Sequence, residues 1–213
     1  MITHYKGDEK RINEVDLGRM GEMGEIDEID LGVTVTEQIA QTLRTDAPFE
    51  ARLETTAHEL RQLEALQPEQ WQTLIEAERL AILQEVELII AKNQGRPPVE
   101  VHIEPNASSG LLGIYSPSTN QIAISQTHLN NDNVQKVLET LAHESRHAYQ
   151  YYAVDHLDFH PDAPEVEVWR ENMANYLDAE MYGQKRYERQ PIEIDARRYG
   201  REIVESVYDE IKK

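Results

Sequence analysis

Residues 131–148 read NDNVQKVLETLAHESRHA, and this stretch decides how the rest of the chain is interpreted. The run Asn131-Asp132-Asn133 offers side chains that commonly cap the first turn of a helix. Apolar residues then recur at helical spacing, at Val134, Val137, Leu138, Leu141 and Ala148. We therefore predict a long amphipathic helix whose apolar face packs on a core.

Inside this helix, residues 143–147 read His-Glu-Ser-Arg-His, the pattern HExxH. Residues four apart project from the same face of a helix, so the rings of His143 and His147 can reach one metal ion. Glu144 can contact a water beside that ion, act as general base and pass the proton to a leaving amine. The motif predicts one catalytic zinc ion, in preference to a helix that merely contains two structural histidines.

A catalytic zinc site usually needs a third protein ligand and one open position. The chain has no cysteine, which leaves histidines and carboxylates as the strong ligands. The positions that complete the site in metzincins hold Gln150 and Ala153, so that arrangement is excluded.

Glu193 is the preferred third ligand, because it lies in the first turn of a predicted helix and can point at a neighbouring helix. Ala196, one turn later, would allow the two helices to approach closely. Asp195, His156 and His160 remain alternatives, Asp195 also as an acceptor for a histidine N–H.

The segments around the motif predict an α+β, predominantly helical fold. Residues 34–95 read as a helical hairpin region, with helices over about 36–43, from about 46 through Leu66, and after Pro68 with Ile75 in its apolar stripe. Strands over 99–104, 111–116 and 121–125 predict a small antiparallel sheet at the start of a domain spanning 96–213. A loop over 155–164 and helices over 165–188 and 192–211 follow, with Trp169 and Tyr176 predicted as core.

Residues 1–33 are rich in glycine and acids and are predicted to form a flexible acidic leader. Within it, residues 14–18 (EVDLG) nearly recur as residues 28–32 (EIDLG). The repeat fits a motif that docks a partner or a pro-segment across the active site. The composition favours the simpler interpretation, a solvated tail with chance similarity.

The formal net charge is −19. A surface this acidic repels phosphate backbones and anionic lipid headgroups, so we expect no nucleic-acid and no membrane partner. The N-terminus lacks the charged-then-apolar pattern of a secretory signal. Cytoplasmic residence and export without such a signal both stay open.

The two strands with their turn, the HExxH helix and a later helix that opens with Glu193-x-x-Ala196 together resemble the gluzincin branch of the zincin metallopeptidases. Over roughly residues 97–205 the chain resembles especially the small bacterial and phage peptidases of this branch. The resemblance implies a zinc endopeptidase acting on a protein or peptide, including as a bacterial or phage effector or toxin. It matches His143, His147 and Glu193 to the zinc ligands and Glu144 to the catalytic base.

The resemblance also implies an edge strand, here 121–125, that pairs with the extended substrate. It implies an oxyanion-stabilising side chain across the cleft, for which Tyr187 is chosen over Tyr182 and His160. Many gluzincins carry an aspartate four residues after the ligand glutamate, and this chain has Arg197 there. Support for a histidine must then come from Asp195 or elsewhere.

Two other functions compete with the peptidase. One is a catalytically silent zincin-fold protein that binds or regulates a partner, against which the presence of Glu144 argues, since holding metal does not require it. The other is a helical interaction module, motivated by residues 34–94 and the acidic repeat.

Overall fold

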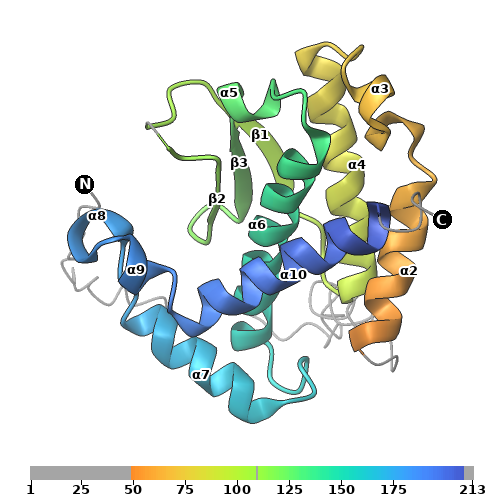
Figure 1. Cartoon of the computed structure of the whole chain (residues 1–213). Coiled ribbons are helices and arrows are strands. Elements are labelled where there is room, and N and C mark those ends of the chain that lie inside the picture. Colours follow the sequence, from red (N-terminus) through yellow and green to blue (C-terminus); the bar gives the residue numbers. More distant parts are fainter. Residues whose placement is uncertain (1–48, 109, 209–213) are drawn as a thin grey trace, which may run out of the picture.

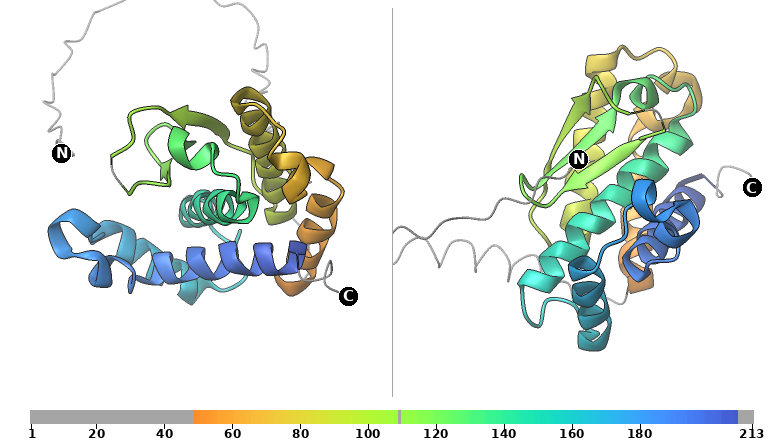
Figure 2. Two further views of the ribbon diagram at one scale, coloured as in Figure 1. Left: turned by 45° about the horizontal axis from the view of Figure 1, so that its top comes forward. Right: turned by 90° about the vertical axis from the view of Figure 1, so that its left-hand side faces the viewer.

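The HExxH helix is the central element of the molecule. The structure, a computed structural model, describes residues 49–108 and 110–208. The helix is α6 (Val134–Asp155), and the Asn133 side chain caps it by accepting a hydrogen bond from the Lys136 N–H. The sheet lies on one side of α6 and α10 (Pro191–Tyr208) on the other (Figures 1 and 2). The prediction of a mostly helical α+β fold is confirmed.

Helices outnumber strands among the described residues, which contain a single small sheet. In chain order the remaining elements are α2 (Phe49–Arg61), the 3-10 turn η1 (Glu64–Leu66), α3 (Pro68–Trp71), α4 (Glu76–Gln94), β1 (Glu100–Glu104), β2 (Gly113–Ser116), β3 (Gln121–Ser125), α5 (Gln126–Leu129), α7 (Ala163–Ala174), α8 (Ala179–Tyr182) and α9 (Gln184–Tyr187). The predicted leader over 1–33 and the helix over 36–43 lie outside the described residues.

The sheet is mixed, so the prediction of an antiparallel sheet was wrong for one strand pair. The strand order is β1-β3-β2. β2 and β3 form the expected antiparallel hairpin, but β1 pairs with β3 in parallel. The chain passes from β1 to the far edge of the sheet before the hairpin begins, and the second hairpin strand therefore lies beside β1.

The apolar core is shared by elements from both halves of the described chain. Leu60 of α2 and Leu83 of α4 belong to the same buried cluster as Ile122 of β3, Leu138 of α6 and Ile203 of α10. All five side chains are fully buried. The described part of the predicted helical region over 34–95 is thus packed against the domain predicted over 96–213.

Two predicted helices are interrupted. The helix predicted after Pro68 is short, and α4 starts only at Glu76, which leaves Ile75 at its N-cap with 66 % of its surface exposed. The helix predicted over 165–188 is split into three pieces. Asp178 caps α8 by accepting a hydrogen bond from the Met181 N–H, and Gly183 at φ 82° ends α8.

Close contact between α6 and α10 depends on small residues on α10. Ala196 is fully buried, as expected for a residue at the helix interface. One turn later, a Cβ at Gly200 would lie 2.8 Å from the carbonyl oxygen of Glu139 on α6. The backbones therefore approach too closely there for any side chain. Among the described helices, none is long and apolar enough to cross a membrane.

Candidate metal centre

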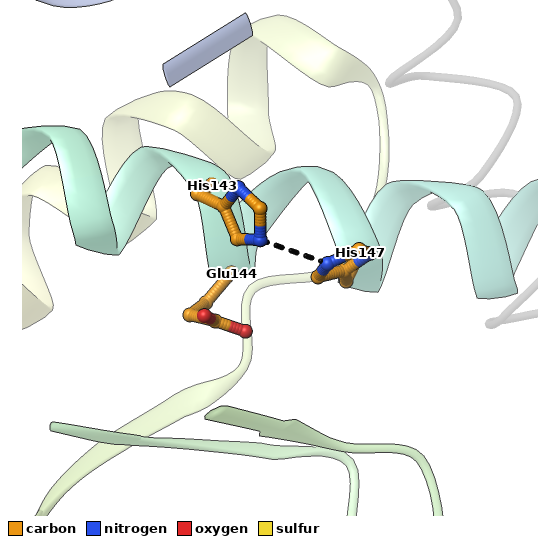
Figure 3. A group of neighbouring side chains, drawn as sticks. All are labelled: His143, Glu144 and His147. Carbon is orange, nitrogen blue, oxygen red and sulfur yellow. Dashed lines mark hydrogen bonds between the residues drawn. The ribbon is translucent and has the colours of Figure 1, made fainter. Parts of the chain in front are cut away.

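The two histidines of the motif lie on successive turns of α6 with their rings adjacent (Figure 3). Their Nε2 atoms are 3.0 Å apart, and the rings meet edge to face with centroids 4.7 Å apart. Both side chains keep some exposure, 14 % for His143 and 11 % for His147. Together with Glu144, these residues form a group that could hold a metal ion.

Glu193 reaches the same point from the first turn of α10. Its Oε2 lies 3.4 Å from Nε2 of His143 and its Oε1 lies 3.4 Å from Nε2 of His147. Two ligands of a tetrahedral zinc ion, with bonds of about 2.0–2.1 Å, are separated by about 3.3 Å. The structure thus brings the predicted third ligand into contact with both histidines, at separations that suit one small cation.

The environment of Glu193 also suits a cation. Its side chain is fully buried, and Oε2 accepts no hydrogen bond from the described residues. Burial alone would raise the pKa of Glu193, but the contacts with His143 and His147 lower it well below its usual range. A buried charge with an unsatisfied oxygen is costly unless a cation compensates it.

Arg197 supplies part of this compensation. It occupies the position where many gluzincins have an aspartate, and its Nη1 lies 3.5 Å from Glu193 Oε2. Its side chain is 31 % exposed, so this cation is partly solvated. Arg197 therefore contacts the carboxylate of the site and gives no support to a histidine.

Glu144 lies beside the histidines but points toward the sheet (Figure 3). One carboxylate oxygen, Oε2, accepts a hydrogen bond of 2.8 Å from the backbone N–H of Tyr115 in β2. No other donor among the described residues binds this side chain. Gly113 lets β2 come this close, because a Cβ there would lie 2.8 Å from Thr140 and 3.3 Å from Glu144. The carboxylate is fixed through one oxygen, and the other accepts no hydrogen bond from the described residues.

Asp195, the main alternative as a ligand, points away from the histidine nitrogens. It forms a buried ion pair with Arg146, with Nε of Arg146 2.7 Å from Oδ2. Gln150 donates to the same Oδ2 at 2.8 Å, and its Oε1 lies 2.8 Å from Nδ1 of His147. Asp195 therefore supports the histidine only through Gln150.

Gln150 fixes the tautomer of His147. Its amide nitrogen is used twice as a donor, to Asp195 and to the carbonyl of Ile192, so its oxygen must face the ring. Nδ1 of His147 then carries the proton, and Nε2 is free to bind a cation. The sequence held a signal for this role, because Gln150 follows His147 by three residues on the same helical face.

The loop histidines take no part in the site. His160 is held between the Tyr149 hydroxyl, 2.8 Å from Nδ1, and Glu165, 3.0 Å from Nε2. His156 caps α6 and stacks on Tyr152 with ring centroids 3.8 Å apart. Both side chains are occupied elsewhere, so His160 is excluded as an oxyanion donor as well.

Two tyrosines flank Glu193. The Tyr176 hydroxyl donates to Glu193 Oε1 at 2.8 Å, and the Tyr187 ring stands perpendicular to that of Tyr176, with centroids 6.2 Å apart. The pKa of Tyr187 is raised by burial and then by the charge of Glu193, and the same causes raise the pKa of Tyr176. Both hydroxyls therefore keep their protons and can donate hydrogen bonds.

Only one of these tyrosines was predicted at the site. Tyr187 lies close enough to Glu193 for its charge to raise the tyrosine pKa, whereas Tyr182 on α8 is 43 % exposed and makes no hydrogen bond to a site residue within the described ranges. Tyr176 was predicted as core with Trp169. Trp169 is buried, but Tyr176 follows the end of α7 and is 43 % exposed.

The strand predicted to bind substrate has no free edge. β3 lies in the middle of the sheet and pairs on both sides, so it cannot receive a further strand. The strand beside the site is β2, which pairs with β3 on one edge and binds Glu144 through Tyr115 on the other. β3 is therefore excluded as an edge that could bind an extended peptide, and β2 is the edge strand that contacts Glu144.

Comparisons with protein-family models, with curated proteins and with solved structures found no match to this chain. What the site does is therefore inferred from its own residues and distances.

Proposed function

We propose that this protein is a zinc-dependent metallopeptidase. The observation that supports this most directly is the triangle formed by Nε2 of His143, Nε2 of His147 and the Glu193 carboxylate, with separations of 3.0, 3.4 and 3.4 Å. Two imidazoles and one carboxylate are a donor set found in catalytic zinc sites. The base residue, Glu144, lies within 4.8 Å of the histidine ligand atoms.

The chemistry follows from this arrangement. When bound, zinc would supply a Lewis acid that polarises the scissile carbonyl and lowers the pKa of water. Glu144 takes a proton from the water, and the water oxygen bonds to the carbonyl carbon. Glu144 then transfers that proton to the nitrogen as the C–N bond breaks, and an acid and an amine leave. The Tyr115 N–H keeps the Glu144 carboxylate in place during both transfers.

Tyr187 is the proposed donor to the oxyanion that forms on the carbonyl oxygen. A protonated hydroxyl near the buried Glu193 carboxylate can donate to a developing negative charge. Tyr187 is the residue predicted for this role, whereas the one hydroxyl proton of Tyr176 is donated to Glu193 and positions that carboxylate. Tyr187→Phe should lower kcat more than it changes KM.

The decisive experiment replaces the base without touching the ligands. Glu144→Gln should retain one zinc ion per chain, measured by elemental analysis, and should lose hydrolysis by a factor of about 100 or more. Unbiased sequencing of new N-termini in a peptide library would measure hydrolysis. Glu139→Gln is the matched control, since it removes the same charge from an exposed position on the same helix.

Each outcome has a distinct meaning. Cleavage that survives in Glu144→Gln would refute the proposed mechanism. Stoichiometric zinc without cleavage in the unmodified chain would favour a silent zincin-fold binding protein. Absence of zinc from the unmodified chain, or zinc that remains bound in a His143→Ala, His147→Ala double variant, would favour a helical interaction module.

A further inference from the structure

A cavity of about 340 Å³ opens between the β2–β3 turn, the C-terminal half of α6 and residues 96–99. We call it the tyrosine cavity, because the rings of Tyr115, Tyr151 and Tyr152 line it together with Asp155 and His156. It is separate from the histidine triangle, since none of His143, His147 and Glu193 lines it. The proposed mechanism of hydrolysis assigns no role to this cavity.

The tyrosine cavity is nevertheless connected to the site. Tyr115 takes part in both, because its backbone N–H holds Glu144 while its side chain lines the cavity. Ala148, another wall residue, follows Glu144 by one turn on α6. A peptide that passes along β2 beside Glu144 would therefore run close to the mouth of the cavity.

The aromatic walls suit a cation. The rings of Tyr115 and Tyr151 are 5.6 Å apart at an angle of 52°, and His156 stacks on Tyr152. The Tyr115 hydroxyl donates to Asn120 at 2.9 Å, which fixes this ring at the turn. The face of a tyrosine ring carries a negative quadrupole that attracts ammonium and guanidinium groups.

The charge at the cavity also favours a cationic ligand. Asp155 is an exposed carboxylate on the last residue of α6, where a helix of 22 residues also ends with its negative dipole. Burial and then the charge of Asp155 raise the pKa of Tyr151. Burial raises the pKa of Tyr115 to about 12, with Arg96 lowering it and Asp155 among the smaller causes that raise it. The field of this carboxylate therefore reaches the aromatic walls, and both tyrosines stay neutral.

The one arginine of the lining does not cancel this preference. Arg96 is 1 % exposed, and its Nη1 and Nη2 bind the two carboxylate oxygens of Glu87 at 2.8 and 3.2 Å. The Arg96 charge lowers the pKa of Tyr115, but Glu87 is paired with it in the core and acts on Tyr115 in the opposite direction. The whole chain, with a net charge of −19, also attracts cationic partners over longer distances.

We propose that the tyrosine cavity binds the ammonium or guanidinium group of a lysine or arginine side chain, and that this side chain belongs to the peptide that enters the histidine site. The aliphatic stem of such a side chain contacts the tyrosine rings while its head lies next to Asp155. The part that concerns the peptide rests on the proposed function. Binding of the cation itself does not.

The test uses the full chain and four small probes, namely the Nα-acetyl amides of arginine, lysine, norleucine and glutamate. NMR titrations at neutral pH and low ionic strength follow the tyrosine resonances. The arginine and lysine probes should bind saturably and shift Tyr115 and Tyr151, norleucine should bind at least about fivefold more weakly, and glutamate should not bind. Arginine and lysine are ranked by the same data.

Asp155→Asn should weaken binding of the arginine probe by about fivefold. Glu69→Gln removes the same charge at an exposed position on α3, outside the cavity, and should leave binding unchanged. A thermal unfolding curve for each variant checks that the fold is intact. Equal binding of norleucine and arginine, or no weakening in Asp155→Asn, would overturn the proposal.

This test and that of the proposed function fail separately. If zinc is bound and peptides are cleaved but no cationic probe binds, the tyrosine cavity is not a cation site and the peptidase remains. If the cationic probes bind but neither zinc nor cleavage is found, the cavity is confirmed and the peptidase is wrong. If all are found, peptides with a basic residue near the cleaved bond should lose kcat/KM in Asp155→Asn, whereas neutral peptides should not.

Discussion

Two fully buried glutamates contact the HExxH segment from opposite sides, and they are satisfied in different ways. Glu87 on α4 receives two hydrogen bonds from Arg96, one from the Val99 N–H and one from the Ser145 hydroxyl. Glu193 on α10 receives the Tyr176 hydroxyl and otherwise faces two imidazoles and the distant end of Arg197. One carboxylate is complete within the protein. The other has one oxygen that accepts no hydrogen bond from the described residues, and its geometry is one that a small cation would complete.

This difference shows what the two variable positions of the motif do. Ser145 connects the helix to the Glu87–Arg96 pair, whose arginine also donates to the Ser145 carbonyl at 3.0 Å. Arg146 connects it to Asp195 on α10, within two residues of Glu193. The stable ion pairs hold the helix from both sides, and the incomplete group lies between them, at the histidines.

The largest effect on stability is expected for Glu87, the glutamate whose carboxylate is fully hydrogen-bonded within the protein. Glu87→Ala leaves Arg96 buried without its charge partner and should reduce the free energy of unfolding by about 3–5 kcal/mol. Urea unfolding of the zinc-free chain measures this change. The double variant Glu87→Met, Arg96→Met replaces both charges and should recover most of the loss. If the double variant is as unstable as the single one, the ion pair is not the cause.

For Glu193, the effect on stability should depend mainly on zinc. Glu193→Gln removes a buried charge that is held only by partly exposed side chains, so the zinc-free chain should lose less stability than Glu87→Ala does. Zinc at 100 times its Kd should stabilise the unmodified chain by about 2.7 kcal/mol, and most of this gain should vanish in the variant. Thermal unfolding with and without zinc measures both. A zinc-independent loss as large as that of Glu87→Ala would remove the distinction between the two glutamates.

A smaller effect is expected for the group that orients His147. Gln150→Leu removes the acceptor for the Nδ1 proton and should weaken zinc binding by about 10- to 100-fold, which competition with a chelator can measure. Gln135→Leu, at an exposed position on the same helix, is the control. Unchanged zinc affinity would mean that the Gln150 contact does not orient the ring.

The smallest effect is expected for a carboxylate that water solvates. Glu167 pairs with Arg170 on α7 while 61 % of its side chain stays exposed. Glu167→Gln should change the free energy of unfolding by no more than about 0.5 kcal/mol and leave zinc affinity unaltered. A change comparable to that of Glu87→Ala would show that burial does not explain the difference between these acids.

The prediction from sequence was accurate where spacing along one element carries the information. The helix around His143 and His147, its asparagine cap and the antiparallel β2–β3 hairpin follow from local periodicity and turn chemistry. It was wrong where the outcome depends on pairing between distant segments. The parallel pairing of β1, the central position of β3 and the break at Gly183 have no unambiguous local signal.

The residues of the site also differ in whether local spacing or tertiary packing determines their position. The sequence by itself determined that two imidazoles share one helical face with a carboxylate beside them, because the helical repeat places residues four apart together. Only the tertiary structure decided that Glu193, and not Asp195 or a loop histidine, meets those imidazoles. That choice depends on how α10 packs on α6, which also brings Asp195 to Arg146. Packing between helices is set by shape and by buried charge across the whole core, which no short stretch of sequence contains.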